Sequence, residues 1–283
     1  MSLFTLIGRR RIRPAWQYTT RGTLWGLYPT REGMMVGEER DLDTKTTSFF
    51  CVDQRGFLRW KNKVYGETWW TGIEAVHADV LLLHGYATPD LPEHKGVIAV
   101  RIADGEELWR NSEVTLLGVR GEEVHATRKL PRGYARITLA LQSGAILRET
   151  DASDDISESV APEPGDGMPV ELPRPLLLGD DEPTEIQRML GAALEPGREI
   201  AGTPEFIERP GFAVFAFSTR ETGKDRFFEG VVSVVARDAR TLLYRDTLGM
   251  SAALPGPMPV MMRGNIMHYV RDRKTLVTVS LPG

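Results

Sequence analysis

The stretch that decides the fold is GVIAVRIADGEELWRN, residues 96–111. Its first half is a run of small and β-branched residues, which is typical of a strand. Asp104-Gly105 then marks a tight turn, because glycine adopts a positive φ without steric cost. A second short run ends in Trp109-Arg110-Asn111. The whole stretch therefore predicts an antiparallel β-hairpin.

The end of this hairpin recurs as a large apolar residue, a base, and then Asn, Asp or Glu. The signature occurs at Trp60-Lys61-Asn62, Trp109-Arg110-Asn111, Leu147-Arg148-Glu149 and Tyr244-Arg245-Asp246, with a looser fifth copy at Trp16. Successive copies are spaced by 44, 49, 38 and 97 residues. A four-stranded propeller blade takes roughly 40–50 residues. The repeat predicts an all-β, β-propeller-like fold.

The gap of 97 residues leaves the number of blades open between five and six. Residues 151–175 are rich in Pro, Gly, Ser and acids, which favours a solvated loop over a blade. Residues 185–194 then place Ile186, Met189, Leu190 and Ala193 on one face of a short helix. We predict one domain over residues 1–283 with five four-stranded blades. An acidic loop and short helix would be inserted between blades at 151–199, and six blades is the alternative.

The two ends of the chain are predicted to meet in one sheet. The last unit offers only three strand-like segments, and residues 13–18 form an unassigned fourth segment near the N-terminus. Pairing of residues 13–18 with residues 275–281 would complete this blade. It would also cover edges that otherwise invite aggregation.

Composition narrows the class of protein. The net charge is -4, and eleven acids with one base lie between Asp151 and Glu185. The basic run Arg9–Arg11 lacks interleaved aromatic residues, so we expect no nucleic-acid partner. No apolar run approaches the roughly 20 residues of a membrane span, and the N-terminus has the wrong order for a secretory signal. We therefore expect a cytoplasmic protein without a membrane partner, and a buried, inert thiol at Cys51.

Two resemblances to known families support this fold. Residues 51–62 and 96–111 resemble the repeats of quinoprotein-like propellers, in which a turn glycine precedes a Leu-Trp pair. The run from Trp69-Trp70-Thr71-Gly72 to Leu91-Pro92-Glu93-His94-Lys95-Gly96 resembles an uncharacterised bacterial family of unknown function, over at least residues 23–150. The resemblance implies a fold and no activity. Many quinone-dependent dehydrogenases carry an adjacent cysteine pair, which a chain with one cysteine cannot supply, so we expect no cofactor.

Histidines and acids gather between residues 77 and 94, at His77, Asp79, His84, Glu93 and His94. Their spacing matches no zinc motif. His77 and Asp79 occupy a predicted hairpin turn, whereas His94 belongs to a loop expected at the opposite end of the blade. We therefore predict hydrogen-bonded structural histidines and no metal site.

The loop at residues 88–96 is a candidate for ligand or partner binding, and the alternative is a structural loop that folds against the neighbouring blade with Leu91 as its plug. It is long for a strand connection, and loops on a rigid scaffold concentrate binding residues. Trp69 and Trp70 begin a predicted inner strand and would face opposite ways. The candidate binding residues are Trp69, Trp70, His84, Asp90, Glu93, His94 and Lys95.

No catalytic motif accompanies these residues, since the chain lacks a Gly-x-Ser-x-Gly elbow and a phosphate-cradling glycine loop. We expect a non-catalytic scaffold that binds a protein, peptide or small ligand through its face loops. A monomer or a weakly associating homo-oligomer is expected. The alternative is a small-molecule enzyme with a metal or acid/base site in the propeller channel.

Overall fold

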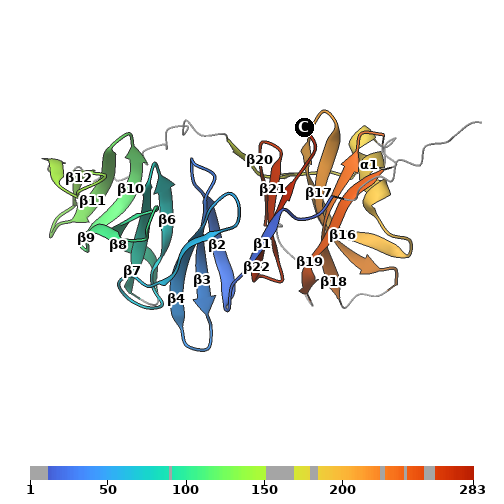
Figure 1. Cartoon of the computed structure of the whole chain (residues 1–283). Helices are drawn as coiled ribbons and strands as arrows, with labels where there is room; N and C mark the ends of the chain where they lie inside the picture. Colours follow the sequence, from blue (N-terminus) through green and yellow to red (C-terminus); the bar gives the residue numbers. More distant parts are fainter. Residues whose placement is uncertain are drawn as a thin grey trace, which may run out of the picture. The chain divides into compact units, whose positions relative to one another are not determined.

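The computed structural model describes residues 12–88, 91–150, 169–178, 184–223, 227–238, 241–251 and 259–283. In these residues, strands β1–β22 form five antiparallel sheets, and there is one helix (Figure 1). The predicted all-β fold and its five blades are confirmed. No helix among the described residues is long and apolar enough to cross a membrane.

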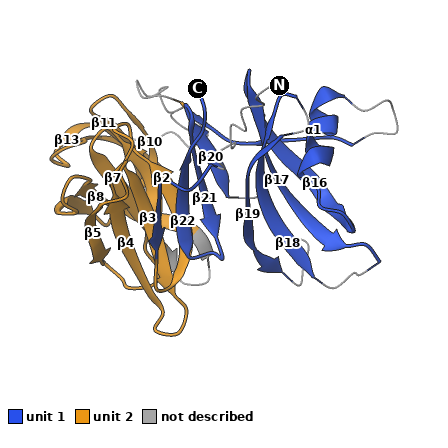
Figure 2. Ribbon diagram, turned by 45° about the vertical axis from the view of Figure 1, so that its right-hand side comes forward, with its two compact units in different colours: residues 1–19, 170–283 blue, residues 20–169 orange. Residues whose placement is uncertain are grey.

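The chain divides into two compact units, and unit 2, residues 20–169, holds three sheets (Figure 2). In each sheet every strand pairs antiparallel with the next one in sequence, as in a propeller blade. The strands are β2 (Thr23–Pro29), β3 (Met35–Asp41), β4 (Thr46–Val52) and β5 (Leu58–Lys63); β6 (Gly72–His77), β7 (Val80–Thr88), β8 (Leu91–Arg101) and β9 (Glu107–Asn111); and β10 (Val114–Arg120), β11 (Glu123–Lys129), β12 (Tyr134–Ala140) and β13 (Ile146–Thr150). Alternating apolar side chains pack between successive sheets. Cys51 is buried there, and burial raises the pKa of its thiol to about 12.

Unit 1, residues 1–19 and 170–283, holds two five-stranded sheets (Figure 2). Their orders are β15-β16-β17-β18-β19 and β1-β22-β21-β20-β14. The strands are β15 (Arg174–Pro175), β16 (Arg198–Glu208), β17 (Phe212–Glu221), β18 (Phe228–Ala236), β19 (Leu242–Ser251), β1 (Trp16–Thr19), β22 (Thr275–Ser280), β21 (Ile266–Arg271), β20 (Val260–Arg263) and β14 (Val170–Glu171).

Strands β14 and β15 lie at the end of the solvated loop predicted over residues 151–175, where no strand was predicted. Each consists of two residues and pairs with the free edge of a blade strand, β20 or β16. Such short pairing needs only an unpaired backbone edge and no β-branched side chains, so composition does not reveal it. Residues 151–168 lie outside the described part of the chain.

The N-terminal segment completes the last sheet, as predicted from the strand count. Strand β1 pairs antiparallel with β22, with Trp16 opposite Thr278 and Thr19 opposite Thr275. The backbone N–H of Ala15 adds a 2.7 Å hydrogen bond to the carbonyl of Thr278. The two ends of unit 1 are therefore joined in one sheet.

The predicted short helix is confirmed as α1 (Glu185–Ala193). Thr184 caps it, with its hydroxyl accepting from the backbone N–H of Gln187, while the Gln187 side chain accepts from the backbone N–H of Thr184. Met189 and Leu190 are buried in an apolar cluster that also contains residues of β17 and β18. Its place as an insertion in a single domain stays a prediction.

The repeat signature marks equivalent contacts in unit 2. The indole N–H of Trp60 on β5 donates to the carbonyl of Ile102, and that of Trp109 on β9 donates to Leu141, both at 2.7 Å. Each acceptor follows the third strand of the next blade. Trp60 and Trp109 therefore occupy equivalent positions on the outermost strands of neighbouring sheets, as predicted.

The turn glycine belongs to the same contact. A Cβ atom on Gly144 would lie 2.6 Å from Cδ2 of Trp109, and one on Gly105 would lie 2.8 Å from Cδ2 of Trp60. Both glycines also have positive φ, +69° at Gly105 and +67° at Gly144. The glycine thus forms the turn of its own blade and makes room for the tryptophan of the preceding one.

We expect Gly144→Ala to destabilise the protein by about 1–3 kcal/mol more than Gly121→Ala does. Both glycines have positive φ, so both variants lose backbone freedom that glycine alone provides. A Cβ on Gly121 meets nothing within 4 Å, whereas one on Gly144 overlaps the Trp109 ring. Urea unfolding of the two variants measures the difference. Equal losses of stability would contradict the proposed ring contact.

Candidate functional site

The predicted loop at residues 88–96 is mostly strand. β7 runs to Thr88 and β8 begins at Leu91, and Tyr86 pairs with His94 across the extended hairpin. A β-bulge at Gly96, with φ of +82°, absorbs one extra residue between the pairs His84–Val97 and Gly85–Lys95. The loop prediction was wrong because β8 has two partners of different length. β8 pairs with β9 only from Val97 onward, but it pairs with β7 as far as Leu91.

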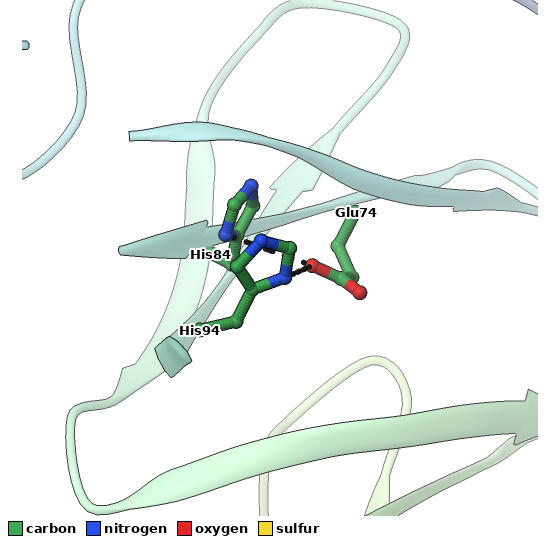
Figure 3. A group of neighbouring side chains, drawn as sticks. All are labelled: Glu74, His84 and His94. Atoms are coloured by element: carbon green, nitrogen blue, oxygen red, sulfur yellow. Dashed lines mark ion pairs between the residues drawn. The ribbon is translucent and has the colours of Figure 1, made fainter. Parts of the chain in front are cut away.

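The extended hairpin brings His84 and His94 together with Glu74 of β6 (Figure 3). Nδ1 of His94 lies 2.7 Å from Oε2 of Glu74, and Nδ1 of His84 lies 3.7 Å from the same oxygen. The centroids of the two imidazole rings are 3.5 Å apart. The sequence predicted two of these three residues as candidates, but it did not predict that they meet.

Burial keeps the inner histidine neutral. His84 is 5% exposed, and its burial together with the nearby His94 lowers its pKa to about 4. Its Nδ1 and the Oε2 of Glu74 are buried without a hydrogen-bond partner of good geometry among the described residues. Two polar atoms of the cluster therefore face each other without being satisfied by the surrounding protein.

A second buried charge pair supports the strand that carries Glu74. Glu38 on β3 forms a 2.7 Å ion pair with Arg40 and accepts a 3.1 Å hydrogen bond from the backbone N–H of Ile73. The hydroxyl of Tyr28 donates to the Ile73 carbonyl at 3.4 Å. The pKa of Tyr28 is raised, first by the burial of its own side chain and second by the negative charge of Glu38. The backbone beside Glu74 is thus held on both its N–H and its carbonyl.

Gly72 sets how closely His84 approaches β6. A Cβ at Gly72 would lie 2.7 Å from Nε2 of His84, so any side chain there would displace the imidazole. The ring therefore packs directly against the backbone of the neighbouring strand.

The two tryptophans precede β6 and do not begin it, contrary to the prediction. They lie in a bend closed by Glu67, whose Oε2 accepts from the N–H groups of Trp69 and Trp70 at 2.9 Å each. These hydrogen bonds lower the pKa of Glu67. Trp70 contacts the ring of Tyr86 edge to face at 5.7 Å, whereas the Arg40 guanidinium lies 5.3 Å from the ring of Trp69. The strand prediction was wrong because the carboxylate satisfies the backbone that a strand partner would otherwise pair.

A cavity of about 300 Å³ adjoins this bend. Its walls include the rings of Trp70 and Tyr86, the aliphatic Val97 and Ile98, and the polar residues Glu67, Lys95, Arg110, Asn111 and Ser112. His94 belongs to the histidine cluster, whereas the next residue, Lys95, lines the cavity.

The candidate binding residues thus separate into groups. His84 and His94 join Glu74, Trp70 and Lys95 line the cavity, and Trp69 lies near Arg40. Glu93 is exposed and lines neither feature, and Asp90 is outside the described residues. His77 and Asp79 lie at the other end of the β6–β7 hairpin, where they contact Gly121 and Gln142.

Sequence reasoning missed Glu74 and Tyr86. Tyr86 could have been found, because it is two residues from His84 and so shares its strand face. Glu74 has no such signal, since the β6–β7 register skips it between the pairs Ile73–Leu83 and Ala75–Leu82. A bulge re-aims a side chain in a way that alternation does not predict.

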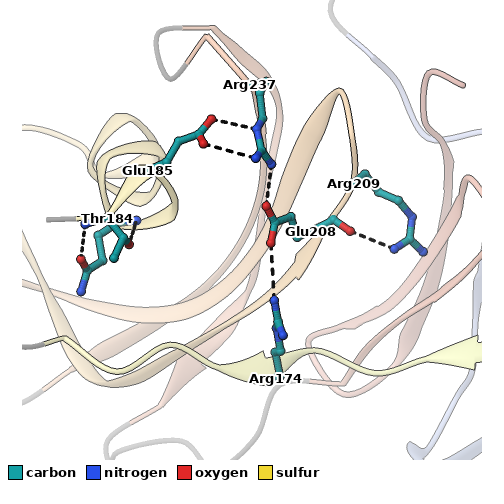
Figure 4. A network of polar contacts seen from close by, with 7 residues as sticks. Arg174, Thr184, Glu185, Glu208, Arg209 and Arg237 are labelled. Carbon is teal, nitrogen blue, oxygen red and sulfur yellow. Dashed lines mark hydrogen bonds and ion pairs between the residues drawn. The ribbon is translucent and has the colours of Figure 1, made fainter.

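Unit 1 contains a separate cluster of charged side chains (Figure 4). Arg237 pairs with Glu185 of α1 at 2.8 Å and with Glu208 of β16 at 2.6 Å, and Arg174 approaches Glu208 at 3.4 Å. A cavity of about 550 Å³ lies beside them. Arg209, which also lines it, pairs with Glu171 at 2.7 Å. Every charged residue lining this cavity has an ionic partner, so the network is best explained as a tie between α1 and the blade.

The repeated four-stranded meanders, with a tryptophan of one blade hydrogen-bonded to the next, define a β-propeller-like repeat protein. Residues 29–109 match a family described as Domain of unknown function (DUF4905). The match confirms the resemblance to an uncharacterised family over less than a third of the chain, and it includes Glu74, His84 and His94. No curated protein matches the chain in sequence.

Solved structures with similarity to the chain include three propeller-class proteins. BamB from Moraxella catarrhalis is 9% identical, with a TM-score of 0.35 over 94% of this chain and 88% of BamB. The C-terminal WD40 domain of Sif2 is 7% identical, with a TM-score of 0.38 over 97% and 99%. A quinohemoprotein alcohol dehydrogenase from Pseudomonas putida HK5 is 12% identical, with a TM-score of 0.31 over 96% of this chain and 44% of the enzyme. At these scores the fold assignment rests on the strand order itself.

Proposed function

We propose that the protein is a non-catalytic binding scaffold that takes a small anionic ligand into the 300 Å³ cavity of unit 2. The observation that carries this proposal is Lys95, an exposed residue of the cavity lining that forms no ion pair with another described residue. Beside it stand the rings of Trp70 and Tyr86. Ligand sites typically combine apolar walls with a few polar groups that orient the ligand. An apolar or aromatic group bearing a carboxylate fits this combination.

The other charged groups on the cavity wall already have partners. Arg110 forms an ion pair with Glu107, and the Glu67 carboxylate accepts the N–H groups of Trp69 and Trp70. Lys95 is therefore the cation of this lining that has no ion pair among the described residues. This favours a single negative charge on the ligand, since a charged hydrogen bond contributes about 1.5–3 kcal/mol.

We expect Lys95→Met to weaken binding of benzoate about tenfold, because loss of the cation removes roughly 1.4 kcal/mol. Ligand-observed NMR of the full chain measures the affinity, with benzyl alcohol as the neutral probe of similar shape. Lys129→Met is the matched control, since Lys129 is an exposed lysine at the end of β11, outside the cavity. Equal benzoate affinity in all three proteins, or no preference for benzoate over benzyl alcohol, would refute the proposal.

A small-molecule enzyme is the alternative, and the 2.7 Å approach of His94 to Glu74 supports it. A carboxylate that orients an imidazole is a common arrangement for general acid–base catalysis. The two functions differ in a measurable way. An enzyme would convert the ligand, and Glu74→Gln would stop conversion while leaving binding intact, whereas a scaffold returns its ligand unchanged.

We further propose that both units form one domain, into which residues 151–199 are inserted. A cytoplasmic location and a monomeric or weakly associating state stay predictions.

A further inference from the structure

We propose that Glu74, His84 and His94 together bind one divalent transition-metal ion of the Zn²⁺ class. This site goes beyond the proposed anion-binding cavity, because Lys95 lines the cavity and none of the three proposed ligands does. The three side chains come from three adjacent strands, β6, β7 and β8, and meet at one point (Figure 3).

The ligand types define the class of metal. Two imidazole nitrogens and one carboxylate oxygen suit Zn²⁺ and related first-row ions, whereas Ca²⁺ and Mg²⁺ prefer oxygen ligands. Three protein ligands leave at least one coordination position for water or another ligand. Glu74 and His94 keep 26% and 39% of their side-chain surface exposed, so the outer side of the site is reachable from solvent.

The distances are close to those that an ion would impose. Metal–ligand bonds of 2.0–2.1 Å in a tetrahedral site place ligand atoms about 3.3 Å apart. Oε2 of Glu74 lies 2.7 Å from Nδ1 of His94 and 3.7 Å from Nδ1 of His84, and one ligand atom from each residue lies within 4.8 Å of the others. Both carboxylate–imidazole distances therefore lie within 1 Å of the separation expected in a tetrahedral site.

The cluster has lone pairs that the described residues do not satisfy. Oε2 of Glu74 and Nδ1 of His84 are both buried without a hydrogen-bond partner of good geometry. Buried polar atoms are normally satisfied, and an unsatisfied one costs about 1–3 kcal/mol. A bound cation would accept both lone pairs at once. The His94–Glu74 contact alone leaves the inner nitrogen of His84 without a partner.

The surrounding structure holds the ligands in place before any ion arrives. Gly72 allows His84 to pack on the backbone of β6, and Glu38 fixes the N–H of Ile73 beside Glu74. The carbonyl of His94 accepts a 3.1 Å hydrogen bond from the Thr115 hydroxyl on β10. These contacts do not involve the metal-facing atoms. Fixed ligands lose little freedom on binding, which favours affinity.

Calorimetric titration of Zn²⁺ into the full chain without an affinity tag is the test. We expect one ion per chain, with His94→Ala and Glu74→Gln each lowering the affinity more than about 100-fold, since loss of an outer-shell partner alone costs 10–100-fold. His77→Ala is the matched control, because His77 is also on β6 but lies at the far end of the hairpin. Co²⁺ bound in place of Zn²⁺ should give visible absorption that is absent from His94→Ala.

Each outcome decides the proposal. Zn²⁺ should also raise the thermal midpoint of the wild type and the His77→Ala variant, but not that of Glu74→Gln, because only a native site stabilises by mass action. No binding by the wild type, or equal affinities of the wild type and both ligand variants, would overturn the site. Lys95→Met should leave Zn²⁺ affinity unchanged, so the metal site and the anion-binding cavity can fail independently. Circular dichroism in EDTA checks that the variants are folded.

Discussion

Replacement of Trp109 by alanine is expected to lower the free energy of unfolding by about 3–5 kcal/mol. The side chain is only 9% exposed and packs against Gly144 in the next blade. Its indole N–H donates to the buried carbonyl of Leu141. Truncation would leave a cavity between two sheets and remove the donor to that carbonyl. The lost packing and the lost hydrogen bond both belong to the tryptophan contact that recurs between neighbouring sheets of unit 2.

Substitution by phenylalanine separates these two effects. Trp109→Phe keeps most of the ring contact but leaves the Leu141 carbonyl without its donor, so we expect a loss of about 1–3 kcal/mol. Trp60→Phe should give a similar value, since Trp60 makes the same 2.7 Å bond to Ile102. Urea unfolding measures all variants. Trp25→Ala is the control, because Trp25 is 54% exposed. A Trp109→Ala loss no larger than that of Trp25→Ala would contradict the argument.

The repeat was predictable because its parts are linked through a physical contact. The Asp104-Gly105 turn has a local signal in positive φ, and the Trp60 ring requires a glycine at that turn. Two residues more than forty positions apart are therefore linked by one contact, and the spacing appears in the sequence. The same holds for the N-terminal strand, because a sheet with three strands has an edge that needs covering.

The candidate site was only partly predictable, because bulges decide it. His84 and His94 stood out by composition, yet their meeting depends on the extra residue at Gly96. Glu74 reaches them from a second bulge in β6. Period-two alternation describes regular strands and fails wherever a residue is inserted. The sequence therefore indicates which residue types are available, and the bulges determine which of them converge.

Short and irregular strand pairing also could not be predicted from the sequence. β14 and β15 are two residues long and gain nothing from side-chain propensity. Trp69 and Trp70 had the composition of a strand, but Glu67 binds their backbone N–H groups and turns the chain. Backbone pairing decides the local structure in the first case, and a side-chain carboxylate bound to backbone N–H groups decides it in the second.

Deletion of residues 1–19 is expected to destabilise unit 1 by several kcal/mol, against a total of roughly 5–15 kcal/mol for a typical domain. The deletion removes β1 and exposes β22, whose Leu276, Val277 and Val279 are buried. It also removes the 2.8 Å bond from Arg271 to the Gln17 carbonyl oxygen Oε1 and the hydroxyl pair of Thr19 and Thr275.

Deletion of residues 1–11 is the matched control, because it shortens the chain while leaving all of β1 in place. The difference in urea midpoint between the two deletions therefore measures the contribution of residues 12–19, which include β1. We also expect the longer deletion to associate at high concentration, since it leaves the edge of β22 unpaired, and unpaired strand edges template further pairing. Sedimentation velocity detects that association. If both variants unfold at the same urea concentration and neither associates more than the other, then pairing of β1 with β22 does not stabilise the last sheet.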